Sequence, residues 1–171
     1  STITATVGEP PLPTATNDTN SGPFDTDQVI SPLTNDSPIA AFPFDQTKVK
    51  LCASNISPPN CVNDEVTTAD GVYTVNPNGT VTFNPLPTFF GTVATPVKYQ
   101  AQDSLGQFEN STIRPTVSQP PLPTATNDIS SGAYDTNQTI SILLNDSSDG
   151  NEQTLKPESV KLCGPSQVSP N

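Results

Sequence analysis

Apolar and polar residues alternate through the middle of this chain, which is the pattern of strands that bury one face. The clearest case is GVYTVNPNGTVTFNP, residues 71–85, where two alternating runs flank the sequence NPNG. An Asn-Gly pair supplies the positive φ angles that a tight hairpin turn requires. Residues 95–117 show the same alternation on both sides of Gly106. The sequence therefore predicts two consecutive β-hairpins.

Shorter strands are predicted in the first half of the chain. Residues 13–18 are expected to form a short edge strand, and residues 28–37 a strand that ends at an Asn-Asp-Ser turn. In residues 47–52, Val49 and Leu51 alternate with two lysines, as in a half-buried strand. No 3.6-residue period persists along the chain. The predicted fold is all-β, an Ig-like antiparallel β-sandwich.

An internal repeat sets the domain organisation. PPLPTATND at residues 10–18 returns letter for letter at residues 120–128, and 20 of the 28 positions that begin at Pro10 match by direct count. The period is 110 residues, the size of one sandwich domain.

This period predicts tandem repeats, one complete and one partial. Residues 1–8 match the end of a repeat and are expected to be the last strand of a preceding one. Residues 9–118 form one complete repeat, and residues 119–171 form the N-terminal half of the next. The proline-rich segment before each copy is expected to act as a semi-rigid spacer, because proline fixes φ and favours an extended polyproline conformation.

The amino-acid composition argues against several classes of function. Seventeen acidic residues against six basic ones give a net charge of −11, which argues against binding to nucleic acid or to anionic membranes. The chain has no histidine, the residue that most often performs acid–base catalysis. It also has no apolar run long enough to cross a membrane. No enzymatic activity is expected.

The spacing of the three cysteines agrees with the internal repeat. Cys52 and Cys61 enclose eight residues, and eight residues also follow Cys163 up to Asn171. We expect a local Cys52–Cys61 disulfide, and a cysteine directly after Asn171 in the parent chain as the partner of Cys163. Free thiols are the alternative, and a metal site is disfavoured because neither histidine nor a CxxC pair accompanies them. A disulfide in each repeat implies an extracellular, oxidising location.

Residues 76–117 resemble the second half of the CshA-type fibril repeat of bacterial surface adhesins. The matching elements are the NGTVTFNP hairpin, the FFGTVATPV approach, the DSLGQ turn and the closing PTV strand, and ATND with DTDQVISPLTND resembles the opening strands. Related repeats occur in cadherin-like surface proteins. The resemblance implies a structural stalk or fibre repeat, a semi-rigid spacer in a tandem array on the cell surface. Its partners would be neighbouring repeats of the same chain, and identical chains in a fibre.

Two alternative functions stay open at this point. The first is a binding module: Asp18, Asp25, Asp36 and Asp103 are candidate calcium ligands, since Ca²⁺ takes six to eight oxygen ligands, although Asn-Asp pairs also form turns. Aromatic residues could likewise hold a sugar, although Tyr73, Phe83 and Tyr99 lie at strand positions expected in the core. The second alternative is a subunit that polymerises by strand addition between molecules.

Overall fold

Both hairpins predicted for the second half of the repeat are present, and they supply the longest strands. β5 (Gly71–Val75) and β6 (Val81–Pro85) pair antiparallel around a turn in which Gly79 has a φ of +79°. β8 (Val97–Gln102) and β9 (Phe108–Val117) pair antiparallel around Gly106, whose φ is +84°. Glycine adopts these angles without strain, and the two hairpin predictions are confirmed.

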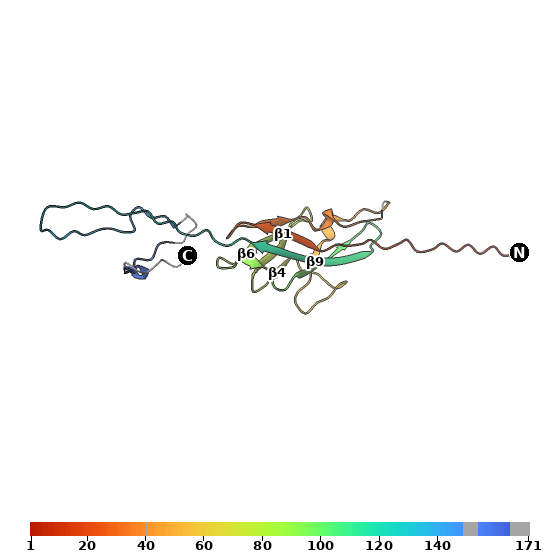
Figure 1. Ribbon diagram of the computed structural model, residues 1–171. Helices are drawn as coiled ribbons and strands as arrows, with labels where there is room; N and C mark the ends of the chain where they lie inside the picture. The colour runs from red at the N-terminus through yellow and green to blue at the C-terminus, as the bar shows by residue number, and fades with distance from the viewer. Residues whose placement is uncertain (40, 149–153, 165–171) are drawn as a thin grey trace. The chain divides into compact units, whose positions relative to one another are not determined.

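The structure is a computed structural model that describes residues 1–39, 41–148 and 154–164 (Figure 1). The chain divides into a first unit, Ser1–Pro120, and a second unit, Pro121–Asn171. Every strand found among the described residues belongs to the first unit. In the same residues the helical segments are single 3-10 turns, and none of them has the length and apolar character of a membrane span. These turns are η1 (Pro32–Thr34), η2 (Gln46–Lys48) and η3 (Pro157–Ser159).

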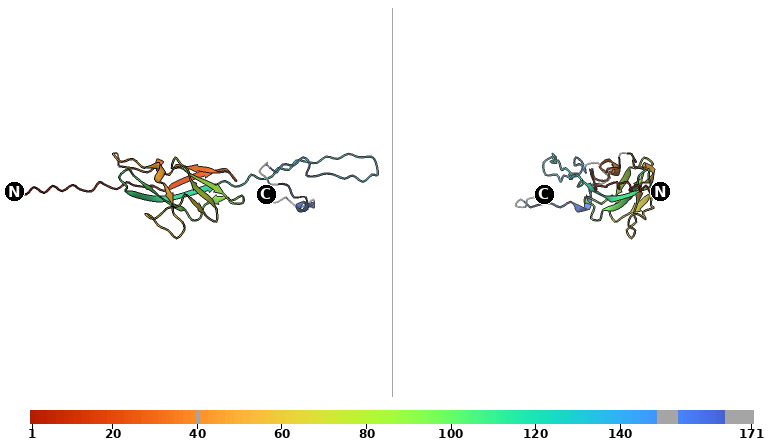
Figure 2. Two further views of the ribbon diagram at one scale, coloured as in Figure 1. Left: turned by 180° about the vertical axis from the view of Figure 1, so that it is seen from behind. Right: turned by 90° about the vertical axis from the view of Figure 1, so that its right-hand side faces the viewer.

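The strands of the first unit form two sheets, which Figure 2 shows from two further sides. One sheet has the strand order β1-β9-β8-β3, and β7 also pairs with β9. The other sheet has the order β2-β6-β5-β4. The bounds not yet given are β1 (Asp18–Gly22), β2 (Gln28–Ile30), β3 (Lys50–Leu51), β4 (Glu65–Thr67) and β7 (Gly91–Thr92).

One hydrophobic core joins the two sheets. Tyr73 and Phe83 from the second sheet stack with ring centroids 4.6 Å apart and are fully buried. Tyr99 on β8 is fully buried as well, so the prediction that these three aromatic residues lie in the core is confirmed. Val49 and Leu51 are buried as their alternation predicts. The remaining buried members are Phe24, Ile30, Val81, Val93, Val97, Ala101, Ile113 and Val117.

The strands of the first half differ from the prediction in extent. The predicted edge strand at residues 13–18 is displaced: β1 begins at Asp18, and Thr14 forms only an isolated bridge with Ser37. The strand predicted for residues 28–37 ends at Ile30, because Pro32 has no N–H to donate and opens the 3-10 turn η1 instead.

The two sheets are not wholly antiparallel. β1 pairs with β9 in parallel, with Asp18 opposite Ile113 and Gly22 opposite Val117. A purely antiparallel architecture is therefore wrong for this edge, although every other strand pair is antiparallel in the described residues. Two sheets rich in antiparallel pairs are established, and the Ig-like assignment stays a prediction.

The second unit repeats the opening bridge of the first but forms no strand among its described residues. Thr124 pairs with Ser147 as Thr14 pairs with Ser37. Residues 128–132, the second copies of β1, remain exposed and without strand structure. In the first unit β1 forms by pairing with β9. Strand formation by this sequence therefore depends on a tertiary partner and not on the intrinsic strand propensity of its residues.

Candidate functional site

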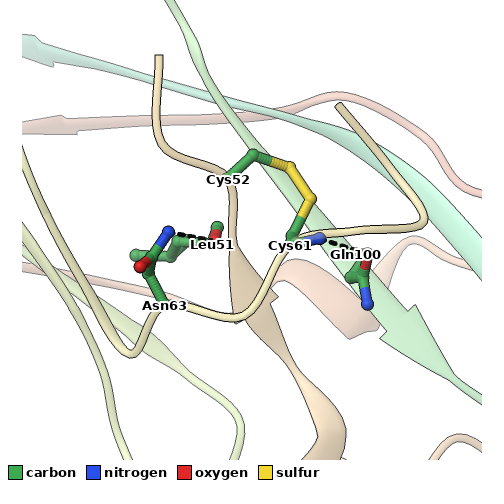
Figure 3. The surroundings of a disulfide bond; sticks show 5 residues. All are labelled: Leu51, Cys52, Cys61, Asn63 and Gln100. Atoms are coloured by element: carbon green, nitrogen blue, oxygen red, sulfur yellow. Dashed lines mark hydrogen bonds between the residues drawn. A yellow bond between two sulfur atoms is a disulfide. The ribbon is translucent and has the colours of Figure 1, made fainter. Parts of the chain in front are cut away.

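A disulfide joins Cys52 to Cys61 and closes the loop between β3 and β4, with the two Cα atoms 4.4 Å apart (Figure 3). Both cysteines are buried. The Cys61 N–H donates to Oε1 of Gln100 at 3.0 Å, and the Cys52 N–H donates to the carbonyl of Lys98 at 2.9 Å. The loop is thus anchored to β8 at both of its ends.

A second anchor fixes the segment that follows the disulfide. The backbone of Asn63 exchanges hydrogen bonds with Leu51, at 2.8 and 3.2 Å, and its side-chain amide also donates to the Leu51 carbonyl at 3.4 Å. An ion pair between Lys50 and Asp64 lies beside these bonds. Cys163 is exposed and forms no disulfide among the described residues, and the partner predicted for it lies outside these residues.

The four candidate calcium ligands do not gather in one place. Asp25 is an exposed residue with a φ of 49° in the segment before β2. Asp103 is buried in the β8–β9 turn, where its Oδ1 accepts the N–H groups of Leu105 at 2.9 Å and Gln107 at 2.8 Å. Asp18 and Asp36 lie near each other. Within the described residues, no group of three or more His, Cys, Asp or Glu side chains has the geometry to hold a metal ion.

Asp18 and Asp36 instead belong to a buried acidic cluster with Glu109 and Tyr99. The Tyr99 hydroxyl donates to Oδ2 of Asp36 at 2.7 Å, and the Thr16 N–H donates to Oδ1 of Asp36 at 2.7 Å. Glu109 is only 4% exposed and Asp18 only 5%. Both carboxylate oxygens of Glu109 and Oδ2 of Asp18 accept no hydrogen bond from a conventional donor.

Burial favours the protonated form of Glu109 and of Asp18. It raises the pKa of Glu109 to about 8, with a hydrogen bond to the Asp36 carboxyl and the negative charge of Asp36 acting in the same direction. Burial also raises the pKa of Asp18 to about 7; contact with the Tyr99 hydroxyl opposes this rise, and the charge of Asp36 adds to it. A protonated Glu109 can donate its proton to Asp36, which gives one of its two buried oxygens a hydrogen-bond partner.

The cluster is therefore a structural, proton-sharing group. It ties β1, the segment after η1, β8 and β9 together from inside the protein. All four side chains are at most 8% exposed, so a substrate has no direct access to them. The sequence analysis named Asp18 and Asp36 but missed Glu109 and the Tyr99 contact.

The sugar-binding alternative depends on exposed aromatic residues. Phe90 and Phe108 are 50% and 44% exposed, whereas Phe89 packs against the core with its ring 6.4 Å from that of Phe83. A groove of about 390 Å³ lies between the disulfide loop, β4 with its following turn, and the segment that leads into β8. Its lining is aliphatic, hydroxyl-bearing and charged, without an aromatic residue among the described side chains, and thus lacks a platform on which a sugar ring stacks.

Comparison with known proteins agrees with the resemblance noted in the sequence. The curated proteins contain no match to this chain. A family model described as the surface adhesin CshA repetitive domain matches residues 10–117, from the proline-rich segment to the end of β9. The matched range covers both sheets, the disulfide loop and the acidic cluster, and the chain belongs to the family of the surface adhesin CshA repetitive domain.

Proposed function

We propose that this chain is a spacer segment in the shaft of a bacterial surface adhesin, located outside the cell. Membership of the adhesin repeat family points to a structural role in adhesion. The internal period of 110 residues supports a tandem array in which each repeat contacts its neighbours in the same chain. Function then resides in length and durability, and no catalytic chemistry is required.

The parallel pairing of β1 with β9 is the observation that best supports this proposal. Because the two strands run in the same direction, the chain enters at the end of the sheet near Asp18 and leaves at the opposite end near Val117. A repeat with its ends on opposite sides adds its own length to an array. A repeat with both ends on one side would fold the array back on itself.

Two further features suit a protein that stands outside the cell. The disulfide persists in an oxidising environment. The net charge of −11 keeps a long fibre soluble and makes neighbouring fibres repel each other.

Inserted copies of the repeat test the proposal. One, two or four additional copies of residues 9–118 would be placed between Ser118 and Gln119, and the maximum dimension measured by small-angle X-ray scattering. We expect an equal increment for each copy. A dimension that grows only as the cube root of mass would show that the repeats collapse together, and would refute the spacer role.

The same arrays test the binding alternative. Thermal unfolding would be compared with millimolar calcium and with chelator. A spacer without a calcium site unfolds at the same temperature in both, whereas a ligand that binds the folded state raises the unfolding temperature as its concentration increases.

A further inference from the structure

The first and last strands of the repeat lie side by side and run in the same direction (Figure 1). Five consecutive residue pairs join them, from Asp18 with Ile113 to Gly22 with Val117. The polypeptide continues before β1 and after β9, so tension along the chain pulls the start of β1 and the end of β9 apart. We propose that the β1–β9 pair is a tension-bearing clamp that protects the repeat from mechanical unfolding. This inference rests on the proposed spacer function.

The direction of the force relative to the hydrogen bonds is the physical reason. Tension along two parallel neighbours slides one strand past the other, so all the bonds between them are loaded at once. The bonds of a parallel pair are evenly spaced, and they share the load. When two strands are pulled apart from the same end, the load falls on one bond at a time. Sliding therefore requires a larger force than peeling for the same set of bonds.

Side-chain and backbone bonds extend the clamp beyond the strand at both ends. Oδ1 of Asn17 accepts hydrogen bonds from the hydroxyls of Ser111 and Thr112, both at 2.8 Å. At the other end the Ser118 N–H donates to the Gly22 carbonyl at 2.9 Å. The connections between the two strands thus run without interruption from the residue before β1 to the residue after β9.

A buried glutamine fastens both strands of the clamp to the second sheet. Gln28 on β2 is 3% exposed, and its Nε2 donates to the Thr116 carbonyl on β9 at 3.0 Å. Its Oε1 accepts from Nδ2 of Asn20 on β1 at 3.2 Å. A Cβ atom on Gly22 would lie 2.6 Å from Cγ of Gln28, so glycine at this position leaves the room that Gln28 needs. Sliding of β1 must therefore also break its link to Gln28.

The disulfide supplies an internal marker for force experiments. It encloses residues 53–60, in the middle of the repeat and away from β1 and β9. The enclosed residues cannot extend while the bond is intact. With nine residue steps between the cysteines, reduction should lengthen the unfolded repeat by about 3 nm, at roughly 3.5 Å for each step. An unfolding event with this difference belongs to the first unit.

The direction of pulling gives the sharpest test. The whole 171-residue chain would be stretched in an optical trap with handles at both termini, and then with handles at the N-terminus and at position 105. Leu105 is 45% exposed and lies in the β8–β9 turn, at the same end of the sheet as the start of β1. The second geometry peels β1 from β9. We expect the first unit to unfold at a clearly higher force between the termini, and equal forces in the two geometries would overturn the proposal.

A matched pair of variants tests the side-chain bonds. Asn17→Ala removes the acceptor for Ser111 and Thr112, and Asn127→Ala makes the same change at the second copy of the position, outside the β1–β9 pair. Two hydrogen bonds of about 1 kcal/mol each correspond to roughly a tenfold to thirtyfold faster unfolding at constant force. Asn127→Ala should leave the rate unchanged. Equal unfolding rates for the two variants would show that the Asn17 side chain does not strengthen the clamp.

The outcome is separable from that of the proposed function. Array length is measured at zero force and does not depend on how β1 separates from β9. Arrays that lengthen in equal steps, together with forces that are independent of direction, would support the spacer and refute the clamp. Arrays that collapse, together with forces that depend on direction, would refute the spacer and support the clamp.

Discussion

The buried acidic cluster should make the repeat more stable in mild acid than at alkaline pH. Glu109 has a pKa of about 8 in the folded protein against an ordinary value of 4.5, and Asp18 about 7 against 3.8. Between the ordinary and the raised values the folded state binds protons that the unfolded state has released. Stability from these groups is fully present below pH 4 and is lost as the pH rises through 7 and 8.

The expected size follows from the pKa of Glu109. Each unit of difference corresponds to 1.36 kcal/mol, so Glu109 alone loses about 3 kcal/mol of folding free energy between pH 5 and pH 8. Asp18 contributes less than its separate value, because both groups interact with the charge of Asp36. We expect a total decrease of about 3–4 kcal/mol, which is large against the 5–15 kcal/mol of a typical domain.

Urea unfolding of the whole chain, followed by circular dichroism at several pH values, measures this decrease. Glu109→Gln keeps the shape of the side chain and can donate to Asp36 at every pH. At pH 5 the variant should match the wild type, and at pH 8 it should be more stable by about 2–3 kcal/mol. Glu65→Gln, on the exposed β4, removes the same formal charge and is the control.

Two results would refute this reasoning. If stability stays constant or increases from pH 5 to pH 8, the cluster does not hold protons in the folded state. If the curves of Glu109→Gln and Glu65→Gln both run parallel to that of the wild type, the pH dependence comes from the overall negative charge and not from the buried carboxyl group.

Three further changes have expected sizes. Replacing Cys52 and Cys61 by alanine should reduce the free energy of unfolding by about 2.7 kcal/mol, the loop-closure value for about ten residues, measured by urea unfolding against the oxidised wild type; an unchanged midpoint would show that the loop is already fixed by its hydrogen bonds. Gly71→Ala places a methyl group against the backbone of β6 and should cost at least about 2 kcal/mol, whereas Gly8→Ala, with open space around it, should leave the melting temperature unchanged. Phe83→Ala empties a fully buried site and should cost about 3–5 kcal/mol in the same assay, and a loss below 1 kcal/mol would mean that the core refills the space.

The hairpins were predictable because their signals are local. Asn78 and Gly79 mark one turn and Gly106 the other, and alternating residues continue on both sides. β1 was misplaced because its sequence, DTNSG, has no apolar alternation and forms a strand only against β9. Parallel pairing between residues so far apart leaves no mark within the segment itself.

Only part of the acidic cluster could be predicted from the sequence. Asp18 and Asp36 stood out beside asparagines, but Glu109 was not named as a candidate. The alternation of β9 is set by Ile113 and Val117, which are buried. Counting back in steps of two from Ile113 places Glu109 inward and Phe108 outward, as the structure has them. The alternation of β9 taken over its whole length was therefore the signal that could have identified Glu109 as an inward residue.

The pairing of β1 with β9 also has a consequence for how the repeat folds. Asp18 pairs with Ile113, which lies 95 positions further along the chain, and such long-range pairing is slow. A chain that becomes available from its N-terminus first has an unfinished sheet until its last strand has emerged. The sheet that contains β1 therefore cannot be completed before β9 is available. In the proposed array, β9 would thus set the moment at which each repeat completes its fold.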